Sequence, residues 1–256
     1  MATSSASTAS TPAAASQASP MVMRIIGFCA LAHLINDLIQ SVLPAIYPML
    51  KANYDLSFAQ IGMITLTFQI TASLLQPWVG FFTDRRPTPN LLPLGTLCTL
   101  VGIVMLAFVG SFPMILLASA LVGIGSSTFH PETSRIARLA SGGRFGLAQS
   151  TFQVGGNTGS ALGPLLAAAI VIPFGQTHVA WFGLAGLFFL GVTLMLRGWY
   201  KEHLNQAKAR KTVQATHGIS RNRVIAALIV LGLLVFSKYF YMALSLIHIS
   251  EPTRPY

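Results

Sequence analysis

The chain has 256 residues, of which 53% are hydrophobic and only 9% are charged, and its mean hydropathy is +0.65. A soluble globule of this size could not cover its surface with so few charges, so the composition excludes that class and indicates a membrane protein. The net charge of +10 does not indicate nucleic-acid binding, because the basic residues are spread over short loops and form no single patch with interleaved aromatics.

In chain order, residues 1–20 are rich in Ala, Ser and Thr and are expected to be a disordered cytoplasmic tail. Seven apolar blocks follow, most of which reach the ~20 residues that a helix needs to cross the bilayer. The blocks are Ile25–Leu50, Ile61–Phe82, Leu91–Gly110, Met114–His130, Leu147–Ile172, Val179–Leu196 and Val224–Ile247. We therefore expect an all-α polytopic membrane protein. It would contain a six-helix bundle over 21–197, a basic cytoplasmic linker over 198–223, and a seventh helix over 224–247 that begins a second half.

The positions of the basic residues predict the orientation of these helices. Lys and Arg occupy every second gap between the blocks, whereas the intervening gaps hold only Lys51. Because basic loops are retained on the cytoplasmic side of a bacterial inner membrane, the amino terminus is expected inside the cell.

The first block carries a polar stripe in which His33, Asn36, Asp37 and Gln40 are spaced i, i+3, i+4 and i+7 along one helix face. An ionisable group at membrane depth is costly and usually faces a bundle interior or an aqueous cavity. Asp37 and His33 are therefore expected to carry protons, and Asn36 and Gln40 to contact a substrate. The alternative is that hydrogen bonds from Asp37 to His33 or Asn36 only hold the bundle together.

Two further groups lie at the ends of blocks that are expected to face the cytoplasm. The second block ends in Gly80-Phe-Phe-Thr-Asp84-Arg85-Arg86, which can be an ordinary interfacial ion pair. The fourth block ends in His130-Pro131-Glu132, where two titratable groups flank a proline that is expected to break the helix. His130 and Glu132 are predicted to share the proton-carrying role of Asp37.

The fifth block has a small-residue face made by Gly155, Gly159 and Gly163, and Pro164 follows it. This pattern predicts close helix packing and a kink, because proline lacks an amide donor. Gln153 and Asn157, on the same block, are expected to contact a substrate.

Three stretches resemble the fosmidomycin-resistance branch of the major facilitator superfamily. They are GIGSSTFHPETSRIARLASGGRFGLAQSTFQVGGNTGSALGPLL from Gly123 to Leu166, HLINDLIQSVLPAIYP from His33 to Pro48, and FSKYFYMA from Phe236 to Ala243. The resemblance implies a twelve-helix carrier that exports a small anionic drug such as fosmidomycin by proton antiport. Gly80, Asp84 and Arg85 would form the superfamily's conformational latch. Lys238, a cation within an apolar block, would meet the anion or pair structurally with Asp37 or another carboxylate.

The resemblance also implies the partners of the protein. These are a lipid bilayer, a small-molecule substrate and a C-terminal half absent from this chain, which together would make a monomeric carrier. No cofactor other than the proton gradient is expected, and neither a metal nor nucleic acid.

Residues 244–256 resemble a translated sequencing adaptor, so we expect a non-native tail on a truncated copy that is inactive alone; a natural short tail is also possible. The same fold could instead carry a sugar, an organic acid or another drug, and a non-transporting membrane scaffold is a further hypothesis. A hydrolase could use Ser126 or Ser127 with His130, or a metal held by His130 and Glu132. Both forms are disfavoured, because the chain lacks the GxSxG pattern of a serine nucleophile and the HExxH pattern of a zinc site. We therefore do not expect an enzyme.

Overall fold

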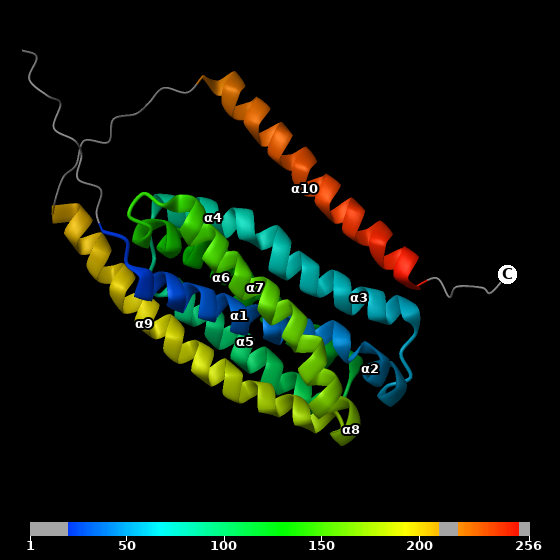
Figure 1. Cartoon of the computed structure of the whole chain (residues 1–256). Coiled ribbons are helices and arrows are strands. Elements are labelled where there is room, and N and C mark those ends of the chain that lie inside the picture. Colours follow the sequence, from blue (N-terminus) through cyan, green and yellow to red (C-terminus); the bar gives the residue numbers. More distant parts are fainter. Residues whose placement is uncertain (1–19, 210–219, 251–256) are drawn as a thin grey trace, which may run out of the picture. The chain divides into compact units, whose positions relative to one another are not determined.

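A computed structural model describes residues 20–209 and 220–250, and the regular elements within them are all helical (Figure 1). The bundle consists of α1 (Met23–Ala45), α2 (Tyr47–Asn53), α3 (Phe58–Gln69), η1 (Ile70–Leu74), α4 (Leu75–Arg85), α5 (Leu91–Phe108), α6 (Phe112–Ala140), α7 (Phe145–Leu166), η2 (Ala167–Val171), α8 (Ile172–Phe174), η3 (Gln176–Trp181) and α9 (Phe182–Ala209). A second unit holds α10 (Arg221–Ser250).

Within the described residues, six helical stretches are long and apolar enough to cross a membrane. They are Met23–Ala45, Phe58–Arg85, Leu91–Phe108, Phe112–Ala140, Phe145–Phe174 and Gln176–Gln206. The predicted six-helix bundle is thus confirmed. In α10 the apolar part is the shorter stretch Asn222–Ser237, at the position of the predicted seventh helix. The predicted start of the linker at residue 198 falls inside α9, and residues 210–219 lie outside the described part of the chain.

The fourth span does not end at Pro131, so the predicted helix break is wrong. α6 continues through this proline to Ala140. A transmembrane helix tolerates proline because neighbouring groups and small local adjustments satisfy the freed carbonyl. His130 and Glu132 therefore lie on one continuous helix. Residues that are two positions apart in an α-helix are separated by about 200° around its axis, so the side chains of His130 and Glu132 point to opposite faces.

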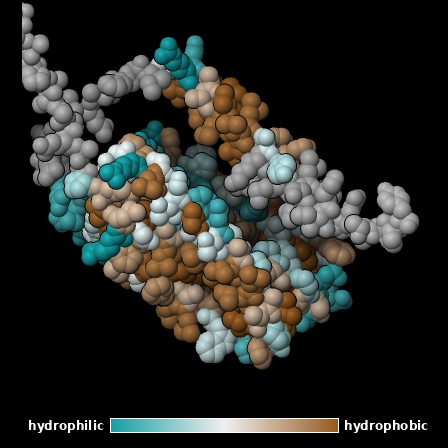
Figure 2. Space-filling model, viewed as in Figure 1, coloured by the Kyte–Doolittle hydropathy of each residue, from teal (hydrophilic) through white to brown (hydrophobic). Residues whose placement is uncertain are grey.

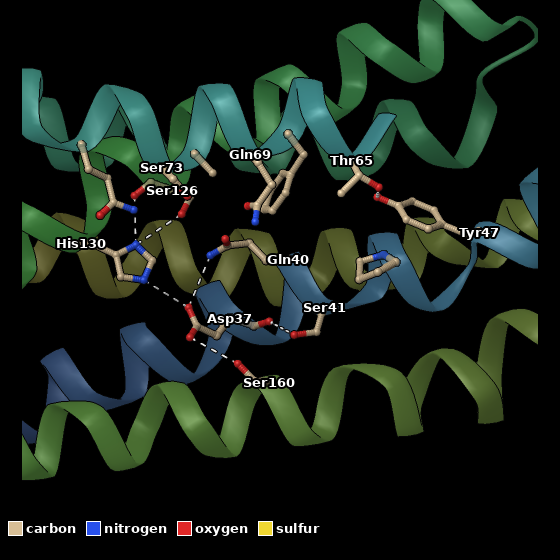
Figure 3. A pocket seen from close by; sticks show the side chains of 14 residues that line it. Asp37, Gln40, Ser41, Tyr47, Thr65, Gln69, Ser73, Ser126, His130 and Ser160 are labelled. Atoms are coloured by element: carbon tan, nitrogen blue, oxygen red, sulfur yellow. Dashed lines mark hydrogen bonds and ion pairs between the residues drawn. The ribbon is translucent and has the colours of Figure 1, made fainter. Parts of the chain in front are cut away.

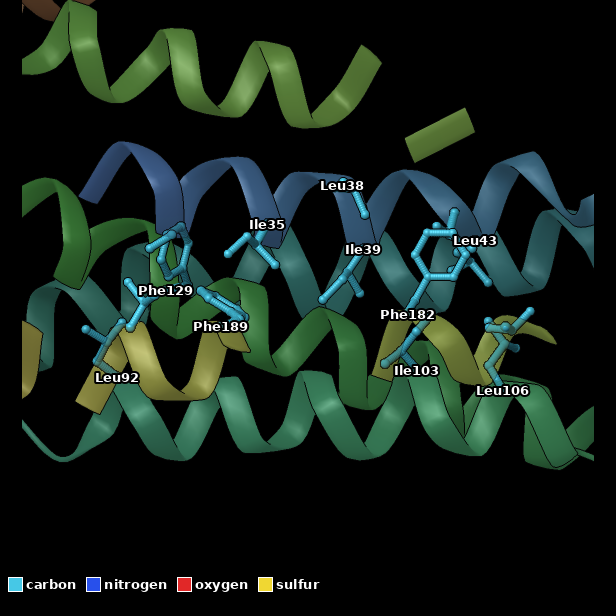
Figure 4. Packing of buried hydrophobic residues seen from close by; sticks show 14 of the residues in the cluster. Ile35, Leu38, Ile39, Leu43, Leu92, Ile103, Leu106, Phe129, Phe182 and Phe189 are labelled. Atoms are coloured by element: carbon cyan, nitrogen blue, oxygen red, sulfur yellow. The ribbon is translucent and has the colours of Figure 1, made fainter. Parts of the chain in front are cut away.

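The core of the bundle lies between α1, α5, α6 and α9 (Figure 4). Ile35 and Ile39 of α1 pack there with Ile103 of α5, Phe129 of α6 and Phe189 of α9. Lipid tails are as apolar as these side chains, so close packing, and not escape from water, has to hold the helices together.

Large apolar areas, coloured brown, lie on the face of the bundle that Figure 2 shows. Large exposed side chains include Trp78, Leu165 and Leu187. Such a surface is suited to lipid or to another apolar partner, and it would promote aggregation in water.

Two spans contain a π-helical turn, η1 within the second span and η2 within the fifth. η2 begins three residues after Pro164, where we predicted a kink. π-Helical turns in α-helices are frequent at functional sites, and η1 borders the cavity described below.

Candidate functional site

The centre of the candidate site is a triad of His33 and Asp37 from α1 and His130 from α6. His33 Nε2 lies 3.3 Å from Asp37 Oδ2, and His130 Nε2 lies 3.4 Å from Asp37 Oδ1. Asp37 is 18% exposed and His130 26%, whereas His33 is almost fully buried. The structure thus brings together three of the four residues that were predicted to carry protons.

Each histidine ring is held by its other nitrogen. His33 Nδ1 lies 2.8 Å from the carbonyl oxygen of Phe152, and the ring of His33 stacks on the ring of Phe152 with centroids 4.0 Å apart. His130 Nδ1 lies 3.1 Å from the carbonyl oxygen of Ser126 and 3.3 Å from the hydroxyl of the same residue. Both Nε2 atoms are thereby turned toward Asp37.

Neutral donors complete the surroundings of the Asp37 carboxyl group. Asn36 donates to Oδ1 over 3.0 Å. Gln40 donates to the same oxygen over 3.4 Å, and Ser160 of α7 donates to Oδ2 over 3.4 Å (Figure 3). The polar stripe in the sequence identified the donors on α1. Ser160 was missed, and its position next to the small-residue face of α7 was the available signal.

A cavity of about 440 Å³ adjoins the triad, and Asp37 and His130 line one end of it. Most of the other residues that line it have neutral polar side chains, and Pro44, Phe68 and Ala72 add apolar surface. The lining also includes Gln40, Ser41, Tyr47, Thr65, Gln69, Ser73, Gln76, Ser126 and Ser160. These side chains supply hydroxyl and amide groups that can bind and orient a small polar molecule.

The remaining predicted substrate residues are placed differently. Asn36 is buried, and it contacts Asp37 without lining the cavity. Gln153 and Asn157 are exposed, and Gln153 donates to Asn157 over 3.3 Å, away from the cavity lining. Lys238 lies in α10, and its side chain is outside the described part of the structure.

Glu132 does not join the triad, because it lies on the opposite face of α6. It belongs to a second group, here called the Arg135 cluster, formed by Thr83, Asp84, Glu132, Arg135 and Tyr200. Arg135 donates to Glu132 over 2.6 Å and to Thr83 over 3.0 Å, and it also pairs with Asp84. Glu132 is fully buried, whereas Asp84 is 73% exposed.

The predicted latch residues contact different partners in the structure. Asp84 pairs with Arg135. The guanidinium of Arg85 stacks over the ring of Phe81, and its Cζ atom lies 3.4 Å from the ring centroid. Gly80 faces Pro131 at ordinary contact distance. Arg135 was not identified from the sequence, although its i+3 spacing from Glu132 was a usable signal.

The glycine face of α7 packs directly on the backbone of α1. An added Cβ would lie 2.1 Å from the Ala30 carbonyl oxygen at Gly155, 2.0 Å from that of Leu34 at Gly159, and 2.6 Å from that of Leu38 at Gly163. The three glycines therefore allow α7 to place Phe152 and Ser160 against the stripe of α1.

Gly159→Ala should weaken this packing, because its Cβ would meet backbone that cannot move without shifting α1. We expect a loss of about 1–3 kcal/mol, the usual cost of overpacking. The measurement is the unfolding temperature of the protein in detergent. Gly146→Ala is the matched control on α7, since its Cβ would meet nothing within 4 Å. Equal unfolding temperatures for the two variants would contradict the role given to Gly159.

The triad can hold protons or a cation. Its ligand atoms all lie within 4.8 Å of one another, a spacing that also suits a metal ion, although the sequence led us to expect none. Two imidazoles that share one carboxyl group provide a site at membrane depth where protonation changes the local charge.

Comparison with known proteins gives the family. The family model described as Major Facilitator Superfamily matches residues 29–251. Over 221 residues the chain is 56% identical to the Fosmidomycin resistance protein of Escherichia coli (strain K12), covering 86% of this chain and 54% of that protein. Over 214 residues it is 41% identical to the MFS-type transporter YfnC of Bacillus subtilis (strain 168), covering 82% of this chain and 51% of that one.

A solved structure supports the same fold. A crystal structure of the peptide transporter POT in complex with alafosfalin matches with a TM-score of 0.56 at 16% identity, covering 85% of this chain and 46% of the other. The chain spans about half the length of the curated relatives it matches. The family is one of transporters, so the hydrolase hypothesis falls away, and the predicted superfamily and branch are confirmed. The chain belongs to the Major Facilitator Superfamily, in its fosmidomycin-resistance branch, and is a multi-pass bacterial membrane protein.

Proposed function

We propose that this chain is part of a carrier that exports a small anionic drug such as fosmidomycin in exchange for protons. The observation that carries the proposal is the 56% identity to the Fosmidomycin resistance protein over 221 residues, a stretch that includes most of the six-helix bundle. Because the chain spans about half of that relative, transport itself is proposed for the complete gene product.

The triad is the proposed proton carrier. A charged group within the membrane costs roughly 2.5–3.5 kcal/mol on insertion scales, so Asp37 is costly to keep unless it has a function. Its cavity-facing position gives a proton access, and a neighbouring histidine that binds a proton offsets its negative charge.

Alternating access would couple these events. In transporters built from two repeats, the halves rock about a site near the middle of the membrane. We propose that substrate and protons occupy the cavity in alternation, and that the Arg135 cluster at one end of α4 and α6 stabilises one of the two conformations. Lys238, in the segment that would begin the other half, remains the proposed cation for the substrate.

The direction of transport depends on the orientation of the helices. We propose a cytoplasmic amino terminus on the basis of the basic loops. A peptide tag placed before Met1 should then react with antibody only after spheroplasts are permeabilised. Reaction in intact spheroplasts would reverse the assigned direction.

The function is tested by expressing the complete gene in a susceptible strain that lacks its own efflux carriers. We expect resistance to fosmidomycin, and drug-dependent alkalinisation of the lumen of inverted vesicles as protons leave in exchange. Resistance without proton movement would support drug export but contradict proton antiport. An absence of resistance, together with transport of a sugar, an organic acid or another drug, would contradict the proposed substrate but not the membership of the family.

A further inference from the structure

The protons of the triad can be counted from its hydrogen bonds. A carbonyl oxygen only accepts hydrogen bonds, so His33 Nδ1, 2.8 Å from the Phe152 carbonyl, has to carry a proton. The nearer partner of His130 Nδ1 is also a carbonyl oxygen, that of Ser126 at 3.1 Å. Both rings therefore use Nδ1 as a donor, which leaves Nε2 as a bare lone pair when the ring is neutral.

Both bare nitrogens would then face carboxylate oxygens. A lone pair of nitrogen and an oxygen of Asp37 repel each other at 3.3 or 3.4 Å unless a proton lies between them. A proton on the carboxyl group itself can serve only one of the two contacts. Two protons are needed to make both contacts hydrogen bonds, in addition to those on the Nδ1 atoms.

We propose that the triad holds two exchangeable protons in this conformation, one in each contact between a histidine and Asp37, and that both are exchanged in one transport cycle. The first part rests on the geometry alone, and the second rests on the proposed function. With both protons bound, the triad carries one net positive charge, and with neither bound it carries one negative charge. The occupied and empty triads thus differ by two charges at the wall of the cavity.

Among the described residues, the side chains that surround the triad on the other helices are not charged, so they do not supply these protons. α7 brings Phe152 and Ser160 against it, and α6 brings Ser126 and Phe129. η1 and α4 add Ser73 and Gln76 to the cavity wall, neither of which titrates. Tyr47, the remaining ionisable group in the lining, forms a hydrogen bond with Thr65.

The position of His33 depends on the absence of a side chain at residue 156. A Cβ at Gly156 would lie 2.4 Å from both Cε1 and Nε2 of the His33 ring. Gly156 is therefore a positioning residue for the first of the two proton contacts. Gly156→Ala should displace the ring and break the contact of His33 without changing any titratable group.

The variant His130→Gln tests the count of two. A glutamine amide can donate to Asp37 from a position close to Nε2, but it does not titrate. For the complete protein in liposomes, the ratio of protons to drug, measured from the reversal potential, should be two in the wild type and one in His130→Gln. His203→Gln, on α9 beside Trp199, should keep the ratio of two. A wild-type ratio of one, or an unchanged ratio in His130→Gln, would overturn the exchange of both protons.

A second measurement separates this inference from the proposed function. In the protein with ¹⁵N-labelled histidine, kept in nanodiscs with a chelator so that no metal replaces a proton, both rings should keep the Nδ1 proton and lose one from Nε2 as the pH rises. Gly156→Ala should release His33 from this pattern and leave His130 in it. A neutral ring with its proton on Nε2, in either histidine of the unaltered protein, would overturn the count. If the spectra are as expected but the complete protein shows no proton-coupled transport, the proton count stands and the proposed function is contradicted.

Discussion

Asp37→Asn should abolish proton-coupled export and leave the protein folded. The asparagine side chain keeps nearly the same shape, and its single oxygen can still accept from either Gln40 or Ser160, but it cannot bind or release a proton at neutral pH. Drug resistance should fall to the level of cells without the gene, and drug-induced proton movement in vesicles should disappear. Substrate binding, measured by calorimetry, should persist, because most of the cavity wall is unchanged.

Asp55→Asn is the matched control for this experiment. Asp55 is the same residue type and is exposed, and its φ of 48° is a conformation that asparagine tolerates well. This variant should transport as the wild type does. The unfolding temperatures of both variants should lie within roughly 4 °C of the wild type, equivalent to about 1 kcal/mol. Proton movement that persists in Asp37→Asn would remove this residue from the mechanism.

The sequence predicted the membrane spans and the α1 members of the triad because these depend on local patterns. Apolar length identifies a span, and the i, i+3, i+4, i+7 spacing places His33 and Asp37 on one face of a helix. His130 was also predicted to take part, because it and Glu132 are titratable groups beside a proline at the end of an apolar block. Its contact with the far oxygen of Asp37 could not be predicted, because it depends on the rotation and height of α6 against α1.

Glu132 shows why proximity in sequence misleads on a helix. It was grouped with His130 because a proline between them was expected to end the helix. In a continuous α6 the two side chains point in opposite directions, and Glu132 meets Arg135 one turn later. The partners on α4 and α9, such as Asp84 and Tyr200, come from helix packing that no local pattern contains.

Arg135→Gln should be the most destabilising of the substitutions considered, because it leaves the fully buried Glu132 without its cation. Removing one partner of a buried ion pair typically costs about 3–5 kcal/mol, which corresponds to a fall in unfolding temperature of roughly 10 °C for a chain of this size. The pair with Asp84 adds little to this cost, because that carboxylate is 73% exposed and remains solvated. Differential scanning of the detergent-solubilised protein measures the effect.

The double variant Glu132→Gln with Arg135→Gln isolates the cause. Two neutral amides at these positions remove the uncompensated charge, so most of the lost unfolding temperature should return. Arg138→Gln, one turn further along α6 at an exposed position over the ring of Phe145, should cost less than about 1 kcal/mol. If the double variant is as unstable as Arg135→Gln alone, the burial of Glu132 is not the source of the loss. Arg135 would then act through Thr83 and Tyr200, whose hydroxyl groups it also contacts.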